Sequence, residues 1–169
     1  MALFSIDINN LQDLFVEQLR DLYDGERQIT HALPQMIEKA SNTQLKNALQ
    51  EHLDVTHQQI QRLEQIFQSL GQKAKGESCK GMEGIIDEGE DLVSKGNDPG
   101  VVDASIITAA QRVEHYEIAG YGTVRTYAQQ LGRQDFARLL EQTLSEEKDA
   151  DQVLNQIANT ANIEARKAA

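Results

Sequence analysis

Apolar residues recur at helical spacing in four long segments of the chain. Residues three and four positions apart lie on one face of a helix, and this spacing persists through each segment. The alternation typical of a strand is missing, and proline occurs only twice. The pattern predicts an all-α protein with a single domain over residues 1–169. The four predicted helices cover about residues 7–40, 43–70, 103–131 and 134–161.

Two short turns join these helices in pairs. Ser41 and Asn42 separate the first two helices, and both residue types favour turns and helix N-caps. Gly132 separates the last two and suits the left-handed residue that ends many helices. Short connections make neighbouring helices antiparallel. We therefore expect two antiparallel helical hairpins.

A long connection of about residues 71–100 links the two hairpins. It holds 7 of the 11 glycines and one short amphipathic stretch, Met82 to Val93. We interpret it as a crossover that carries a short helix, not as a fifth helix of the core. Because it is long enough to run along a whole helix, we expect the third long helix to start at the same end as the first. A four-helix bundle with one long crossover is the ferritin-like topology.

Several polar residues fall on the apolar faces of these helices. Successive residues turn by about 100° around a helix, so each side chain can be placed relative to its apolar stripe. Asp54 and His57 fall off the core face of the second helix. The central inward positions are Glu26, His52, Thr56, Glu117 and Glu147, and the flanking ones are Glu114 and Asp151.

Four of the inward residues should lie at one height in the bundle. Glu26 and Thr56 are each 15 residues from the turn at Ser41. Glu117 and Glu147 are likewise each 15 residues from the turn at Gly132. Among the other inward residues, His52 lies about one turn nearer the first loop, while Glu114 and Asp151 lie about one turn farther from the second loop.

A layer of converging carboxylates needs a counter-charge. Buried carboxylates repel one another and are costly to desolvate unless they are protonated, paired or bound to a cation. The helical geometry places no lysine or arginine centrally in this layer. Oxygen ligands with one imidazole suit iron or manganese. The inward residues also have structural interpretations: Thr56 and His52 as hydrogen-bonded core groups, Glu114 and Asp151 as surface or interface charges, and the common level of Glu26, Glu117 and Glu147 as a coincidence.

The charge of the chain restricts its partners. There are 16 Lys and Arg residues against 27 Asp and Glu, which gives a net charge of −11. This charge opposes nucleic acid and anionic membranes as partners. No export signal or membrane-spanning run is visible, so we expect a cytoplasmic protein. Cys79 is the only cysteine, which excludes an intrachain disulfide, and we interpret it as a helix-start or packing residue.

Five phrases are distributed over nearly the whole chain: "DLYDGERQITHALPQM", "EHLDVTH", "CKGMEGIIDEGE", "AAQRVEHYEIAGYGT" and "LLEQTLSEEKDAD". Together they resemble the bacterial YciF-type stress proteins, a ferritin-like family. The resemblance implies a ferritin-like four-helix fold, a homodimer, a cytoplasmic setting and an association with stress responses. It implies no particular reaction.

The wider class includes rubrerythrin, whose di-iron ligands follow a pattern along four helices. Residues matching this pattern are Glu26 on the first helix, Glu114 and Glu117 on the third, and Glu147 on the fourth. Asp151 stands where the fourth helix of rubrerythrin has a histidine. On the second helix, Asp54 and His57 match the spacing but lie off the core face. We therefore prefer His52 as the nitrogen ligand, with Asp54 and His57 as the alternative.

Three hypotheses follow, in order of preference. The first is a ferritin-like protein that binds iron or manganese, as one ion or as a dinuclear centre bridged by Glu26 and Glu117. An open coordination position there would admit a small oxidant such as oxygen or peroxide. The second is a non-enzymatic helical dimer with a vestigial metal site, motivated by the degraded motif on the second helix. A Dps-like DNA protector comes third, because the net charge and the lack of a basic tail oppose it.

Overall fold

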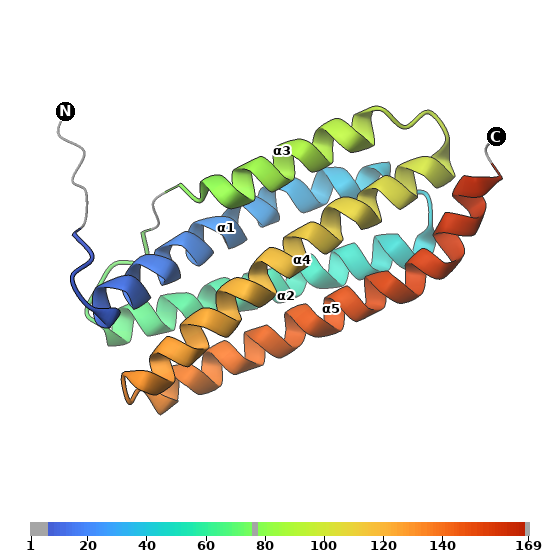
Figure 1. Ribbon diagram of the computed structural model, residues 1–169. Helices are drawn as coiled ribbons and strands as arrows, with labels where there is room; N and C mark the ends of the chain where they lie inside the picture. Colours follow the sequence, from blue (N-terminus) through green and yellow to red (C-terminus); the bar gives the residue numbers. More distant parts are fainter. Residues whose placement is uncertain (1–6, 76–77, 168–169) are drawn as a thin grey trace, which may run out of the picture.

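The computed structural model describes residues 7–75 and 78–167, and within these residues every regular element is an α-helix. Four long helices lie side by side, and a shorter one lies along their outside (Figure 1). The expected all-α class is confirmed. Residues 1–6, which contributed to the expectation of no export signal, lie outside the described part. The helices are α1 (Leu11–Lys39), α2 (Thr43–Ser69), α3 (Lys80–Ser94), α4 (Pro99–Gln130) and α5 (Gln134–Arg166).

The helix boundaries follow from capping side chains. Asn10 accepts a hydrogen bond from the backbone N–H of Asp13 at the start of α1, and Asn42 does the same for Leu45 at the start of α2. These contacts satisfy amides that have no partner within the helix. At the α4–α5 turn, Gly132 has a φ of 72°, the left-handed conformation expected for this residue.

The direction of α4 corrects one expectation. Asp103, in the second turn of α4, accepts hydrogen bonds from the backbone N–H groups of Ser41 at 2.7 Å and Asn42 at 3.0 Å. Because Ser41 and Asn42 form the α1–α2 turn, α4 begins at the end of the bundle where α1 finishes, not where α1 starts. The crossover leaves from the end of α2 and runs the length of the bundle before α4 begins (Figure 1).

The crossover helix α3 is packed more deeply than expected for a connection. It contacts α4 and α1, and Met82 and Val93 are buried in the core. A Cβ atom on Gly89 would lie 2.8 Å from the Cβ atom of Ala109 on α4, so glycine allows the two helices to approach closely. Cys79 is the N-cap of α3, where its sulfur accepts a hydrogen bond from Met82.

The hydrophobic core consists of two clusters with a polar layer between them. One cluster includes Phe15, Phe67 and Phe136, and the other includes Leu45 and Ile106. The polar layer consists of inward side chains from the middle of the long helices. Within the described residues, no helix is both long and apolar enough to span a bilayer.

Candidate metal centre

Four of the predicted inward residues converge in the middle of the bundle. His52 from α2, Glu114 and Glu117 from α4 and Glu147 from α5 each offer one ligand atom, and these atoms lie within 4.8 Å of one another. All four residues are buried. The His52 Nε2 atom is 3.7 Å from the nearer oxygen of Glu114. Three helices therefore bring three carboxyl groups and one imidazole to a single point.

Glu26 supplies a fourth carboxyl group from α1. It is completely buried, and its Oε1 accepts a hydrogen bond from the hydroxyl group of Tyr121 on α4. After burial, the negative charge of Glu26 is the main cause of the raised pKa of Glu117. It is therefore part of the same electrostatic cluster, although it lies outside the four residues whose ligand atoms converge.

Many polar atoms in this cluster have no hydrogen-bond partner in the protein. A buried polar atom without a partner costs free energy, and such atoms are few in folded proteins. Here most of them are carboxylate oxygens in or beside the polar layer, joined by one imidazole nitrogen and one amide oxygen. The carboxylate and imidazole donors fit a divalent cation such as iron or manganese. The atoms are Glu26 Oε2, His52 Nε2, Gln59 Oε1, Glu114 Oε2, both Oε atoms of Glu117, Glu147 Oε2 and Asp151 Oδ1.

Burial controls the protonation of the cluster. It raises the pKa of Glu147 from 4.5 to about 7. Burial, together with neighbouring carboxylates, raises the pKa values of Glu26, Glu114 and Glu117 well above the ordinary range. Burial lowers the pKa of His52 to about 4, so this imidazole is neutral at pH 7 and its lone pair is free for a cation.

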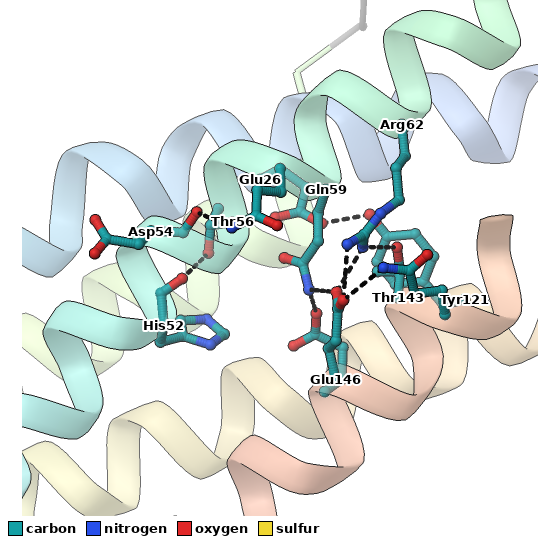
Figure 2. Close-up of polar contacts among 12 residues, drawn as sticks. Glu26, His52, Asp54, Thr56, Gln59, Arg62, Tyr121, Thr143 and Glu146 are labelled. Atoms are coloured by element: carbon teal, nitrogen blue, oxygen red, sulfur yellow. Dashed lines mark hydrogen bonds and ion pairs between the residues drawn. The ribbon is translucent and has the colours of Figure 1, made fainter.

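The α2 side of the layer contains two residues that the helical pattern did not single out. Gln59 is fully buried and donates a hydrogen bond from its side-chain amide to Glu147. Arg62 donates to both carboxylate oxygens of Glu146, at 2.5 and 2.7 Å, and to the hydroxyl group of Thr143. Figure 2 shows these side chains directed between α2 and α5. An arginine therefore borders the layer, whereas the prediction concerned only lysine and arginine at central positions.

The remaining residues of α2 are placed as the helical geometry indicated. Thr56 is buried, and its hydroxyl group donates to the backbone carbonyl of His52 at 2.8 Å, which is the hydrogen-bonded structural interpretation. Asp54 and His57 are exposed, and Figure 2 shows Asp54 pointing away from the layer. Although the spacing of these two residues matches the ligand motif, their side chains lie outside the cluster.

Asp151 lies at the edge of the site. It is not one of the four residues whose ligand atoms converge. Its carboxylate accepts a hydrogen bond from Asn155 at 3.1 Å and lies 3.3 Å from Nε2 of the exposed His115. Its negative charge still contributes to the raised pKa of Glu114. Asp151 therefore remains a predicted ligand whose present contacts are with neighbouring surface residues.

Relatives of this chain carry the same fold. YciF of Escherichia coli K12 is 41% identical over 166 residues, which is 97% of this chain and the full length of YciF. The crystal structure of this stress protein superposes with a TM-score of 0.87 over 91% of this chain and 98% of its own. YcfI of Rhodopseudomonas palustris, which has a provisional structural role, is 47% identical, with a TM-score of 0.87 over 90% of this chain and 98% of its own.

A more distant structure supports the fold alone. A protein from Xanthomonas campestris is 22% identical, with a TM-score of 0.71 over 93% of this chain and 95% of its own. The family model described as "Domain of unknown function (DUF892)" matches residues 10–168. With this match and the likeness to YciF along its whole length, the chain belongs to the DUF892 family.

Proposed function

We propose that the protein binds iron or manganese in the bundle centre, as one or two divalent ions. The observation that supports this function best is the convergence of His52, Glu114, Glu117 and Glu147, whose ligand atoms lie within 4.8 Å of one another while several have no partner in the protein. A cation would satisfy these atoms and allow the carboxyl groups to ionise at neutral pH.

Glu26 and Asp151 complete the proposed ligand set. Glu26 reaches the cluster from the α1 side, and its hydrogen bond from Tyr121 fixes one oxygen while the other has no partner. Such outer contacts orient the ligands of a metal site. If two ions bind, Glu26 and Glu117 are the proposed bridges because both are central and fully buried. Gln59 would hold Glu147 in place.

The proposed reaction partner is a small oxidant, oxygen or peroxide. A bound redox-active metal supplies one-electron chemistry at such a site. The chain would contribute exclusion of bulk water, because the ligands are buried, and a phenol hydroxyl at Tyr121 beside Glu26. This activity extends the metal-binding proposal by analogy with ferritin-like proteins, since the fold alone does not determine the reaction.

Metal content tests the proposal. Protein purified without a metal-affinity tag would be analysed by mass spectrometry before and after anaerobic loading with iron(II) and manganese(II). We expect about one or two ions per chain, lost when Glu117→Ala and Glu147→Ala are combined. The combination of Asp54→Ala and His57→Ala, which changes an exposed carboxylate and imidazole, is the matched control and should retain the metal. Unchanged metal content in the Glu117 and Glu147 variant would reject the site.

A second candidate function is a non-enzymatic structural dimer. The observation that favours it is the α2 side of the layer, where the side chain of Gln59 hydrogen-bonds Glu147 and that of Arg62 hydrogen-bonds Glu146. The raised pKa values of the buried glutamates are also compatible with neutral carboxyl groups. This function predicts that a chelator leaves the melting temperature unchanged, because no ligand then stabilises the folded state.

A further inference from the structure

A pocket with a volume of about 280 Å³ lies within the bundle beside the candidate metal centre. Its lining comes from all five helices and is mainly apolar, and several of its residues are core residues. Natural small-molecule pockets begin at roughly this volume, and apolar cavities about half as large take up hydrocarbon ligands. The buried apolar lining includes Ile29, Leu33, Met36, Leu49, Ile106 and Leu154.

The pocket exists because small residues occur at positions that face it. Ala32 on α1, Ala48 on α2, Ala110 on α4 and Ala150 on α5 all line the space. Protein interiors are close-packed, and larger apolar side chains at these positions would fill the space. Small side chains from four helices thus leave an apolar space of molecular size next to the polar layer.

One end of the pocket is polar. His52 and Glu114 line it, both are at least nine-tenths buried, and His52 Nε2 and Glu114 Oε2 have no hydrogen-bond partner. Three residues of the lining are exposed, Glu51 on α2 and Asp149 and Val153 on α5, so they mark its opening between these helices. The opening is therefore acidic, and the polar end lies close behind it, since Glu51 and His52 are consecutive.

We propose that this pocket binds a linear, uncharged aliphatic molecule with one polar end, such as a primary alcohol or aldehyde. The polar end lies beside His52 and Glu114, and the chain extends toward Met36 and Ile106. Along α4, Glu114 and Ile106 are eight residues apart, or about 12 Å, which accommodates an extended chain of roughly nine or ten carbons.

Charge and width exclude other occupants. The carboxylates of Glu51 and Asp149 at the opening repel an anionic head group, which disfavours a fatty acid of the same length. A macromolecular helix cannot enter a space of 280 Å³ whose deeper lining is buried core. Because the pocket lies beside the candidate metal ligands, such molecules are the substrate class of that site. This assignment rests on the proposed function. Binding of the aliphatic molecule itself needs no metal.

Calorimetric titration of the full chain with 1-decanol and with decanoate, in EDTA at pH 8, tests the proposal. We expect one decanol to bind per chain with a negative heat-capacity change, because apolar surface is buried, and decanoate to bind at least about tenfold more weakly. The absence of decanol binding, or equal affinity for the two ligands, would overturn the proposal.

Substitutions in the pocket wall and at the opening locate the ligand. Ala110→Leu fills the pocket and should weaken decanol binding about tenfold or more, whereas Ala119→Leu, at an exposed position of the same helix, should not. Combining Glu51→Gln with Asp149→Asn at the opening should tighten decanoate binding roughly fivefold and leave decanol binding unchanged. Wild-type decanol affinity in a folded Ala110→Leu protein would reject the assignment.

The proposal can fail independently of metal binding. The Glu117→Ala and Glu147→Ala combination should lose metal but retain decanol, and Ala110→Leu should lose decanol but retain metal. Dissociation of a dimer by Ala110→Leu, without any decanol binding to the wild type, would show that the space is covered by a second copy of the chain. That result would overturn the ligand proposal while leaving the metal proposal intact.

Discussion

The glutamates in the centre of the bundle are buried, and burial disfavours the ionised form of their carboxyl groups. Without a cation, the pKa values of Glu26, Glu114 and Glu117 are raised well above the ordinary range, mainly by desolvation, and that of Glu147 is raised to about 7. At pH values between the ordinary pKa of a glutamate and these raised values, the folded state therefore binds more protons than the unfolded state. Its free energy of unfolding must fall as pH rises.

The imidazole in the cluster acts in the opposite direction. The pKa of His52 falls from 6.5 to about 4 on folding. This residue therefore makes the free energy of unfolding rise as the pH increases from about 4 to 6.5. A shift of one pKa unit corresponds to about 1.4 kcal/mol. As pH rises, His52 and Glu147 therefore change the free energy of unfolding by amounts on the order of 3 kcal/mol each, in opposite directions. The three other glutamates determine the net direction.

We predict that the metal-free protein loses stability between pH 5 and pH 8, by a few kcal/mol. Urea unfolding in EDTA at several pH values measures this loss, and Glu117→Gln should flatten the dependence because its side chain cannot ionise. Added metal should stabilise the protein more strongly as pH rises, because protons compete with the cation for the carboxylates. A metal-free profile that is flat or rises with pH would contradict this account of the cluster.

Tyr121 is predicted to stabilise the cluster through Glu26. Tyr121→Phe removes the hydroxyl group that donates to Glu26 Oε1 and leaves that buried oxygen without a partner. We expect the free energy of unfolding of the metal-free protein to fall by about 1–3 kcal/mol in urea denaturation. The half-buried Tyr127 provides the matched variant, Tyr127→Phe, which should cost less. Equal costs would show that the contact with Glu26 contributes nothing specific.

Residue positions around each helix were predictable because a regular helix fixes the direction of every side chain. This geometry placed Glu26, Glu117 and Glu147 inside and Asp54 and His57 outside, as the structure has them. Contacts made by long or neutral side chains were not predictable in this way. Gln59 carries no charge that would mark it as unusual in a core, and Arg62 reaches the layer through its length.

Helical periodicity does not determine how deeply the crossover helix α3 packs or in which direction α4 runs. Periodicity located α3, but its depth depends on the close contact of Gly89 with Ala109 on a distant segment. The direction of α4 depends on how far the crossover travels, and the contact of Asp103 with the α1–α2 turn reveals it. Such long-range contacts have no local signal in the chain.

Asp103 is predicted to fasten α4 to the α1–α2 hairpin. Its carboxylate accepts from the backbone N–H groups of Ser41 and Asn42 and from the Ser41 hydroxyl group at 2.5 Å, while only 4% of the residue is exposed. Asp103→Ala should lower the free energy of unfolding by about 2–3 kcal/mol, because buried donors lose a charged acceptor. Thermal or urea unfolding measures this, with the exposed Asp87→Ala as control. A cost no larger than that of the control would disprove the fastening role.

At the level of the whole molecule, we predict a homodimer. The basis is the resemblance to the YciF-type family. Sedimentation equilibrium should show a species of twice the 18.9 kDa chain mass at micromolar concentration. A chain that sediments only as a monomer would contradict the prediction. In a dimer, the titration with decanol should then give one bound ligand per chain, or two per dimer.

On this view, the inward carboxyl groups are present because a divalent cation binds between the helices. The most direct test is the melting temperature of EDTA-treated, dialysed protein at pH 7.5 with increasing manganese(II) or anaerobic iron(II). At about a hundred times the dissociation constant, a ligand specific for the folded state adds about 2.7 kcal/mol, which raises the melting temperature of a chain of this size by roughly 5–10 °C. We expect this increase, and its absence in the Glu117→Ala and Glu147→Ala combination. A melting temperature that neither metal changes would show that the cluster is maintained by protonation and hydrogen bonds alone.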